Sequence, residues 1–443
     1  MQNSNDSSPK SKRQIGVGIL GFGTVGAGVA AGLLANHVPL AERTGIDIVL
    51  RKVADLDVTT DRGVALPEGV LTTDAMAVIN DPGVDIVVEL IGGCGVAKAF
   101  VKAALQAGKP VVTANKKLLA EHGAEIFGLA EEKNVDLFFG ASVGGGIPII
   151  RALRDGLAGN RIVSIHGILN GTCNYILTKM EREGVAFEAA LAEAQRLGFA
   201  EADPTLDVDG FDTLHKAAIL AALAYGIFPD VGRLPVRGIR GVVEATDFRF
   251  AAELGYKIKL LAIVKQDAEG VEIRVEPTLV PEDGMLASVS GVFNAALVKG
   301  DLADETFYHG RGAGRLPTAS TVIGDIAEVA RGMVADGWPR IALPRTSREV
   351  RVKDRGAITS RHYVRLSLAD TAGSLAAAAG VFGDHHVSIQ AALQKSMPGE
   401  RDGFATVVVM THKALQSDID AALAAISTLP CCGAPPHRLG IEG

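Results

Sequence analysis

A glycine-rich hexapeptide places the strongest constraint on what this chain can fold into. It stands between an apolar, β-branched run at residues 15–21 and a helical repeat of apolar side chains at 24–36. In such a strand–turn–helix unit, glycines permit a tight turn and a close backbone approach to a pyrophosphate, which the helix N-terminus stabilises. The pattern therefore predicts dinucleotide binding, with glycines that serve only packing as the alternative. The candidate binding residues are Gly21, Phe22, Gly23, Thr24, Val25 and Gly26.

Strands and helices alternate through the first third of the chain. Apolar runs such as residues 86–88 (IVV) are typical of parallel strands that are buried on both faces. This alternation predicts right-handed βαβ units and a parallel sheet. The expected elements are strands at 15–21, 46–55, 84–93, 109–115 and 135–143 and helices at 24–36 and 95–107.

The pattern changes after the glycine-rich residues 144–148, and the mixture of strands and helices that follows predicts an α+β domain. Residues 340–360 are rich in Arg and Pro and indicate a linker, after which a compact βαββα unit is expected. In the α+β part we expect strands at 161–169, 258–266 and 271–280, helices at 187–197 and 212–225, and a glycine loop at 308–320 that begins a helix to about Val334. In the last part we expect strands at 362–368, 387–393 and 404–410 and helices at 374–383 and 413–428.

Composition excludes several classes of protein. The 443 residues carry a formal net charge of −7, which argues against a nucleic-acid or anionic-membrane surface. No stretch reaches the roughly 18 apolar residues of a membrane span, and the polar residues 1–13 predict a disordered tail rather than a signal peptide. The cysteines lack zinc-ligand spacing, so we expect a reduced, cytoplasmic protein. They are Cys94, Cys173, Cys431 and Cys432.

Residues 201–219 (EADPTLDVDGFDTLHKAAI) gather five carboxylates around a lysine at the start of an apolar helix. Asp212 and Lys216 are four residues apart and share a helix face. An exposed salt bridge is one interpretation. A partly desolvated cleft is the other, and there the lysine pKa falls so that the amine can transfer a proton at neutral pH.

Two further residues are placed by the predicted parallel sheet. Lys116 follows the strand at 109–115, at the carboxyl edge where open α/β sheets bind ligands. Lys117 is expected to face solvent. Asp55 ends the second strand, where an acid would bond the adenine ribose of NAD, but the nearby Arg62 leaves the 2′-phosphate of NADP open.

The motifs together resemble homoserine dehydrogenase across residues 14–443. The carrying motifs are GFGTVG, ELIGG, TANK, GGGIPII, GILNGTCNYIL, GFAEADPTLDVDGFDTLHK and GRGAGRLPTAS, and the C-terminal YVRLSLADTAGSL is similar to an ACT domain. The resemblance implies an α/β chain with a Rossmann-type parallel sheet, an α+β substrate and dimerisation domain and a ferredoxin-like ACT domain. The implied bounds are a tail at 1–13, a Rossmann domain at 14–148 completed by 310–340, a substrate domain at 149–309, a linker at 341–360 and an ACT domain at 361–443.

The resemblance implies hydride transfer between L-homoserine and L-aspartate 4-semialdehyde with NAD or NADP. Lys216 would be the acid/base and Lys116 would support it. Carboxylates would hold the substrate ammonium, and the matching positions are Glu201, Asp207 and Asp212. Asp209 is expected to be a solvated turn residue, and Asp203 either joins this set or only shapes a turn. The resemblance adds a set of cofactor-binding positions at Asp55, Gly92, Thr113, Lys116, Gly198, Gly312 and Gly314.

The family also implies a sodium-like monovalent cation held by backbone carbonyls, here those of Val143, Gly145 and Ile147, unless these glycines serve only as a hinge. The sequence departs from the family at Gly140, where many members have glutamate, and at Cys173, which we expect only to pack. It departs again at Ala372, where the ACT turn has proline.

The ACT resemblance implies an amino-acid effector such as L-threonine, and the family implies a homodimer or homotetramer. Two rival hypotheses remain at this stage. A semialdehyde dehydrogenase on the same fold would need a catalytic cysteine, for which Cys94 is the candidate. A nucleotide-sensing ACT regulator would bind the cofactor without turnover.

Overall fold

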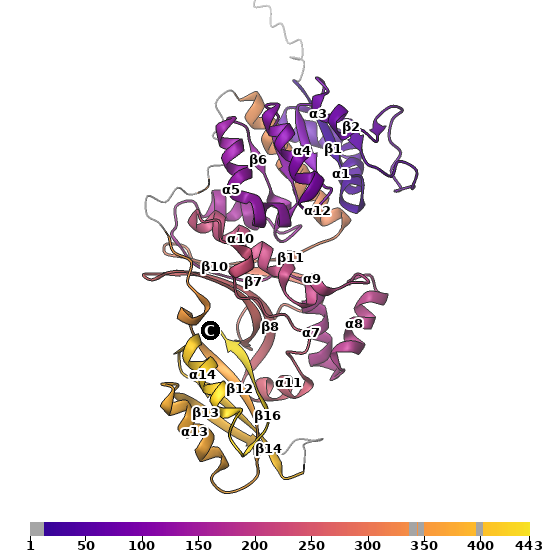
Figure 1. The fold of residues 1–443 in the computed structure, drawn as a ribbon. Helices are drawn as coiled ribbons and strands as arrows, with labels where there is room; N and C mark the ends of the chain where they lie inside the picture. The colour runs from indigo at the N-terminus through magenta and orange to yellow at the C-terminus, as the bar shows by residue number, and fades with distance from the viewer. Residues whose placement is uncertain (1–12, 336–342, 344–349, 396–401) are drawn as a thin grey trace, which may run out of the picture. The chain divides into compact units, whose positions relative to one another are not determined.

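The computed structural model describes residues 13–335, 343, 350–395 and 402–443 (Figure 1). Residues 1–12 of the expected tail and residues 341, 342 and 344–349 of the expected linker lie outside the described residues. The chain divides into two compact units. The first contains Met1–Pro148 and Ala313–Ala342, and the second contains Ile149–Gly312 and Leu343–Gly443.

A six-stranded sheet forms the centre of the first unit, in the order β3-β2-β1-β4-β5-β6. Each neighbouring pair is parallel, which confirms the parallel sheet predicted from the apolar runs. The strands are β1 (Gln14–Leu20), β2 (Asp47–Ala54), β3 (Leu71–Thr72), β4 (Ile86–Glu89), β5 (Val111–Thr113) and β6 (Leu137–Phe138).

The predicted strand at 135–143 was wrong over most of its length. Only Leu137 and Phe138 pair with β5, and a 3₁₀ turn, η1 (Gly140–Ser142), follows. The Gly140 N–H donates to Asp325 Oδ2 at 2.8 Å, so its hydrogen bond goes to a helix side chain instead of a neighbouring strand. This long-range contact ends the strand and could not be read from the local apolar run.

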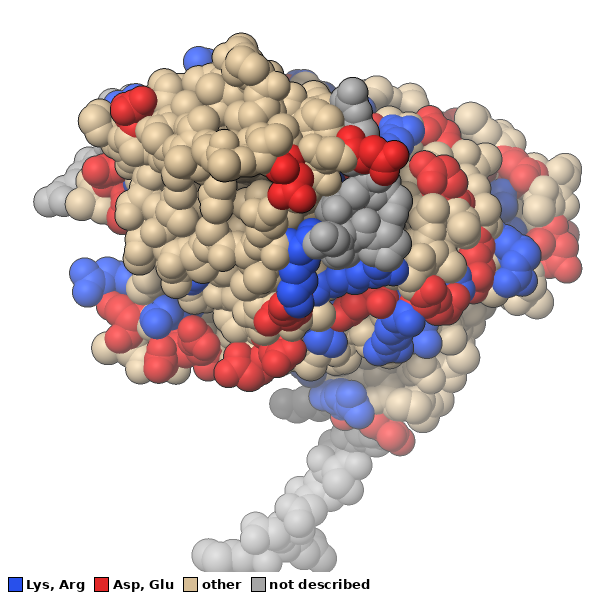
Figure 2. Space-filling model, turned by 90° about the horizontal axis from the view of Figure 1, so that it is seen from below, with Lys and Arg blue, Asp and Glu red and all other residues tan. Residues whose placement is uncertain are grey.

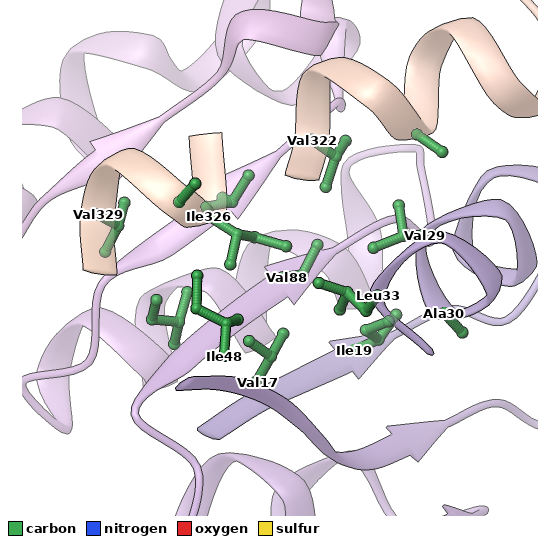
Figure 3. Close-up of a cluster of buried hydrophobic side chains, with 14 of the residues drawn as sticks. Val17, Ile19, Val29, Ala30, Leu33, Ile48, Val88, Val322, Ile326 and Val329 are labelled. Atoms are coloured by element: carbon green, nitrogen blue, oxygen red, sulfur yellow. The ribbon is translucent and has the colours of Figure 1, made fainter. Parts of the chain in front are cut away.

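A helix from far along the chain completes the core of the first unit. In Figure 3 Val322, Ile326 and Val329 of α12 point into the same cluster as Val17 and Ile48, and all five are buried. Each such burial contributes about 1.5–3 kcal/mol. The helices of this unit are α1 (Thr24–Ala35), α2 (His37–Thr44), α3 (Ala75–Asn80), α4 (Gly95–Gln106), α5 (Lys116–Glu132) and α12 (Arg315–Val334).

The second unit is built on a long sheet in the order β11-β10-β7-β8-β9-β16-β12-β14-β13, with β15 paired to β12 at one side. Strands β10 and β11 were not predicted, and the expected glycine loop at 308–320 is shortened because β11 extends to Arg311. The strands are β7 (Ile162–Ile168), β8 (Tyr256–Asp267), β9 (Gly270–Pro281), β10 (Phe293–Gly300), β11 (Asp304–Arg311), β12 (Thr359–Ala369), β13 (Ile389–Lys395), β14 (Phe404–Thr411), β15 (Ala414–Leu415) and β16 (Cys432–Ile441).

Helix α10 is the most enclosed helix described in the second unit. Thirteen of its fifteen residues are buried, and it packs on β8 and β9, so even its polar positions lie inside the protein. The helical segments of this unit are α6 (Ile149–Arg151), η2 (Ala152–Gly156), α7 (Gly171–Glu183), α8 (Phe187–Arg196), α9 (Thr205–Val208), α10 (Phe211–Tyr225), η3 (Val231–Arg233), α11 (Ala245–Glu253), η4 (Arg355–Ala357), α13 (Ser374–Asp384) and α14 (Gln416–Ile426).

The C-terminal module has one strand more than the predicted βαββα unit. Strand β16 follows α14 and pairs antiparallel with β12, which gives a ferredoxin-like βαββαβ module with the strand order β16-β12-β14-β13. Two residues of β16 also pair in parallel with β9, at Gly440 and Ile441. The last strand therefore joins the module to the rest of the sheet.

Within the described part of the chain, no single helix is long and apolar enough to cross a membrane. Helices α1 and α2 are long and apolar enough only when they are taken together, but they bend by 73°. Helix α1 also supplies Val29 and Leu33 to the buried core. On the face drawn in Figure 2, basic side chains lie next to acidic ones rather than forming a separate basic field.

Candidate active site

The glycine turn of the first unit is shaped by steric necessity at two positions. Gly21 has φ +98°, and a Cβ atom there would lie 2.7 Å from the Leu90 carbonyl carbon. A Cβ atom at Gly26 would collide with the Gly21 carbonyl oxygen. At Gly23, the N-cap of α1, no described atom other than those of Gly23 and its two chain neighbours lies within 4 Å of the Cβ position. The turn therefore leaves an open approach to a helix N-terminus, which is where an anionic pyrophosphate binds.

Asp55 lies beside this turn at the end of β2. Its Oδ2 accepts a hydrogen bond from the Phe22 N–H at 2.5 Å, and its Oδ1 accepts one from the Asp57 N–H at 2.9 Å. The Arg62 guanidinium is 3.9 Å from Oδ1 of Asp55 and 3.1 Å from Asp57. An acid and a base thus occupy the position that selects between a ribose hydroxyl and a 2′-phosphate.

A cavity of about 550 Å³ adjoins the turn and Asp55. Its other lining is largely apolar and includes Leu56, Met76, Ile91 and Phe100. An apolar slot with one carboxylate at its edge suits a flat heterocycle attached to a sugar.

A second turn, at the end of β4, is held by a fully buried carboxylate. Glu89 accepts hydrogen bonds from the N–H groups of Ile91 and Gly92 at 2.9 and 3.0 Å and from Thr113 Oγ1 at 2.7 Å. Thr113 is itself fully buried. Its side chain therefore fixes the Gly92 turn through Glu89. Glu89 was not singled out from the sequence, although it begins the ELIGG motif.

Asn115 connects this turn to Lys116. Its Nδ2 donates to the Gly93 carbonyl at 2.7 Å, and its Oδ1 caps α5 by accepting from the Leu118 N–H at 3.1 Å. Lys116 is the first residue of α5 and half-buried, at the carboxyl end of β5 as predicted. Lys117 is exposed, which confirms its expected surface position.

The carbonyl loop expected to hold a cation is buried at Val143, Gly145 and Ile147. The Gly145 carbonyl accepts from Thr321 Oγ1 at 2.7 Å. A Cβ atom at Gly140 would lie 2.8 and 2.9 Å from the two carboxylate oxygens of Asp325. The Asp325 carboxylate therefore occupies the space that a side chain at residue 140 would need. A buried carboxylate beside oxygen-lined backbone fits the ligand preference of a hard cation.

In the second unit Lys216 and Asp212 form a buried ion pair. The Lys216 Nζ donates to Asp212 Oδ2 at 2.7 Å and to the Leu169 carbonyl at 2.6 Å. The side chains are only 9% and 5% exposed, so the interpretation as a solvated surface salt bridge is wrong. Burying two charges costs desolvation free energy, so a buried ion pair contributes little net stability. Buried charged pairs of this kind are typical of functional sites.

Asn170 brings a second carboxylate into the same cluster. Its Nδ2 donates to Asp207 Oδ1 at 2.7 Å and to Asp212 Oδ2 at 2.9 Å, while its Oδ1 caps α7 by accepting from the Cys173 N–H at 2.8 Å. Sequence reasoning missed Asn170, and the only local signal was an N-cap asparagine before the helix in the GILNGTC motif.

The other residues predicted from the sequence for this region do not join the hydrogen-bonded cluster of Lys216, Asp212, Asn170 and Asp207. Glu201 is exposed, and its side chain makes no hydrogen bond or ion pair with the described residues. Gly198 has φ +75° after α8. Asp203 accepts from the Thr205 N–H at 3.1 Å, which makes it a turn residue. Asp209, expected to be solvated, pairs with Arg240.

The two glycines expected near the cofactor belong to different units. A Cβ atom at Gly312, in the second unit, would collide with the Asn294 side chain. Gly314, in the first unit, has φ +121° and is the N-cap of α12. Lys116 and Lys216 are divided in the same way, with Lys116 in the first unit and Lys216 in the second.

The surroundings of both cysteines near the motifs disfavour the thiolate form that a nucleophile needs. Burial, aided by a contact with Glu121, raises the pKa of Cys94 to about 11, so the thiol is protonated at neutral pH. Cys173 is fully buried, which raises its pKa well above the usual value, and its Sγ donates to the Asp207 carbonyl at 3.2 Å. These findings remove the support for a cysteine-dependent semialdehyde dehydrogenase.

The ACT-like turn retains two of its expected features. The Asp370 N–H donates to the Gly403 carbonyl at 2.9 Å, and its carboxylate is exposed. Gly373 has φ +92° and is the N-cap of α13, a conformation that favours glycine.

A glycine turn on a parallel sheet together with a buried lysine among carboxylates defines an oxidoreductase that uses a nicotinamide cofactor. Family models agree: residues 21–140 match "Homoserine dehydrogenase, NAD binding domain", residues 148–327 match "Homoserine dehydrogenase" and residues 362–431 match "ACT domain". The chain belongs to the homoserine dehydrogenase family and carries a C-terminal ACT domain.

Individual relatives extend over nearly the whole chain. A homoserine dehydrogenase of Neisseria gonorrhoeae is 44% identical over 97% of this chain and 99% of its own length, and one of Bacillus subtilis is 40% identical over 97% and 99%. The crystal structure of a homoserine dehydrogenase from Thiobacillus denitrificans is 42% identical, covers 97% of this chain and 99% of its own, and has a TM-score of 0.91. A hyperthermophilic archaeal homoserine dehydrogenase in complex with NADPH is 30% identical, covers 71% and 97%, and has a TM-score of 0.60.

Proposed function

We propose that this chain interconverts L-homoserine and L-aspartate 4-semialdehyde, reversibly and with NAD or NADP, as a step toward threonine and methionine. The observation that carries the proposal is the buried cluster in which Lys216 Nζ lies 2.7 Å from Asp212, and Asn170 joins Asp212 to Asp207. An amine held among carboxylates suits a substrate that is itself an ammonium compound with a hydroxyl to be deprotonated.

Each residue of the cluster has a distinct part in the proposed reaction. When bound, the nicotinamide supplies the hydride acceptor. In the oxidation of homoserine, the neutral amine form of Lys216 takes the proton of the substrate hydroxyl, and in the reduction of the semialdehyde the ammonium form returns it. Asp207 and Asp212, with Glu201 from the exposed loop, hold the substrate ammonium, and Lys116 supports the proton transfer.

The coenzyme is proposed to lie on residues 21–26, with Asp55 bonding the adenine ribose and Gly92, Thr113, Gly198, Gly312 and Gly314 in its surroundings. Asp55 supports a slight preference for NAD, because a carboxylate accepts hydrogen bonds from ribose hydroxyls and repels a 2′-phosphate. Arg62 supports the use of NADP as well, because its guanidinium beside Asp55 suits a 2′-phosphate.

Four further features belong to the proposal. A sodium-like cation is proposed at the carbonyls of Val143, Gly145 and Ile147, with the Asp325 carboxylate nearby. L-Threonine is proposed as an effector of the ACT domain, with weak inhibition because Ala372 replaces a rigid proline. A homodimer or homotetramer is proposed, as is a cytoplasmic location, which the four free cysteines support.

The test is coenzyme reduction by the purified protein with L-homoserine, NAD⁺ or NADP⁺, and L-serine as the control substrate. Serine carries the same ammonium and carboxylate on a chain one carbon shorter. We expect turnover with homoserine, at least tenfold lower kcat/KM with serine, and a ratio of the two coenzymes that gives the preference. If the protein binds the cofactor but does not oxidise homoserine, the proposal is wrong and the nucleotide-sensing ACT regulator becomes the favoured interpretation.

A further inference from the structure

We propose a second ligand site in the second unit: a cavity of about 420 Å³ that takes a small oxyanion, a carboxylate or a phosphate, on Arg237. It lies where β9 meets β16 of the ACT module. Its walls come from five places in the chain: the 235–237 segment, β9, the η4 region, α14 and β16. This site shares no lining residue with the Lys216 cluster or with the glycine turn.

The lining carries an excess of positive charge. Four arginines face two carboxylates. The arginines are Arg237, Arg274, Arg355 and Arg438, and the carboxylates are Glu276 and Asp420. A volume of this size is within the range of roughly 300–1,000 Å³ that is typical of small-molecule sites.

Both carboxylates already have partners. Glu276 Oε2 accepts from Arg438 at 3.0 Å, and its Oε1 pairs with Arg274. Asp420 Oδ2 accepts from Arg355 at 2.9 Å, and its Oδ1 accepts from Gln416 at 2.7 Å. The printed ion pairs of both wall acids therefore go to the other three arginines, and Glu276 acts on Arg237 only through its charge, without an ion pair.

Arg237 is the residue of the cavity wall that is proposed to bind the anion. Among the described residues its guanidinium makes no ion pair, and its one hydrogen bond runs from Nη1 to the Arg438 carbonyl at 2.5 Å. Burial, and then the charge of Arg438, lower the pKa of the half-buried Arg237, and the opposing charges of Glu276 and Asp247 do not fully offset them. Desolvating a charge without a partner is costly, and an anion that enters the cavity removes that cost.

The chemistry of the wall selects an oxyanion over other ligands. A guanidinium presents N–H groups in a planar fork that matches two oxygens of a carboxylate or phosphate. A cation would meet an excess of arginines, and an apolar ligand would leave Arg237 unpaired. The site is also separate from the ACT turn at Asp370 and Gly373, so it does not restate the proposed amino-acid effector.

The experiment measures binding of inorganic phosphate and of succinate to the full chain by calorimetry. Saturating NADP⁺ fills the dinucleotide site, and KCl keeps the ionic strength constant. We expect saturable binding of at least one probe in the wild type and an affinity at least tenfold lower in Arg237→Gln. The matched control is Arg233→Gln, an exposed arginine on η3 that does not line the cavity.

Each outcome decides the proposal. Arg237-dependent binding of phosphate or of succinate supports it and identifies which oxyanion the site takes. No binding, or binding that is equal in Arg237→Gln, overturns it. If Arg237→Gln does not fold, Arg355→Gln replaces it, because that side chain is 59% exposed at the rim and its removal should weaken binding without unfolding. Homoserine turnover is measured in parallel, so failure of the proposed function is seen independently of this site.

Discussion

Asp212 and Lys216 lie one helical turn apart on α10 and form an ion pair of 2.7 Å inside the protein. The helix around them is almost wholly buried, so the pair is shielded from the solvent that weakens surface salt bridges. Desolvation of each charge costs several kcal/mol, which the pair and its hydrogen bonds to Asn170 and Leu169 must offset. The arrangement makes sense as a site that is completed by a charged substrate.

Asn170→Ala is expected to impair substrate binding. The variant removes the donor shared by Asp207 and Asp212 and the cap of α7. Hydrogen bonds to charged groups contribute about 1.5–3 kcal/mol, so KM for homoserine should rise roughly tenfold or more. Steady-state kinetics measure this. Asp230→Ala, which removes only the cap of η3, is the control and should leave KM unchanged.

Gly140→Glu is expected to destabilise this protein. Its Cβ would stand 2.8 Å from the Asp325 carboxylate, and a second carboxylate would enter the same buried space. Overpacking of this kind costs about 1–3 kcal/mol, before charge repulsion is added. Thermal unfolding measures the effect, and Gly128→Ala, where the Cβ position is open, serves as the control. An unchanged melting temperature would show that Asp325 can move away.

Glu442→Gln is expected to lower stability at neutral pH by about 3 kcal/mol, because it breaks a buried ion cluster. Glu442 lies 2.6 Å from Lys265 and 2.7 Å from Arg274. Burial alone would raise the pKa of Glu442, but the contacts with His166, Lys265 and Arg274 outweigh it and hold that pKa well below its usual range.

A depressed folded-state pKa gives a stabilisation that is present above the unfolded pKa, near 4.5, and lost as the pH falls toward the folded value. Urea unfolding of wild type and Glu442→Gln at pH 7 and pH 3 tests this. The difference between them should shrink at pH 3, and a constant difference would contradict the assignment.

Arg62→Gln is expected to shift coenzyme preference toward NAD. The guanidinium stands 3.9 Å from Asp55, beside the place proposed for the adenine ribose and its 2′-phosphate. Loss of that contact should lower kcat/KM for NADP about tenfold and leave NAD nearly unchanged. Parallel kinetics with both coenzymes measure the shift, and an equal loss with both would mean that Arg62 only supports the Asp57 turn.

The sequence predicted those parts of the fold that depend on local pattern. The apolar run at 86–88 and the glycine turn indicated a parallel dinucleotide-binding sheet because both signals lie within a few residues. Strand β16 was missed because its partners, β12 and β9, are far away in the chain and Pro435 and Pro436 weaken its strand pattern.

The site was predicted in its residue types but not in its environment. The spacing of Asp212 and Lys216 fits an exposed pair as well as a buried one, and only the packing of α10 on β8 and β9 decides between them. Asn170 acts through Asp207, which is 37 residues away in the chain, and Glu89 acts through Thr113, which is 24 residues away. No local sequence pattern therefore marks either residue.

Lys216 is proposed to move the substrate proton, and the most direct test compares Lys216→Arg with the wild type. Arginine keeps the positive charge beside Asp212 but stays protonated at all working pH values, so it cannot act as the acid/base. Coenzyme affinity and melting temperature are measured as controls, and Lys299→Ala is the exposed-lysine control. We expect kcat for homoserine to fall by about 10²–10⁴-fold in Lys216→Arg while coenzyme still binds. A Lys216→Arg enzyme that oxidises homoserine at the wild-type rate would contradict the proposal.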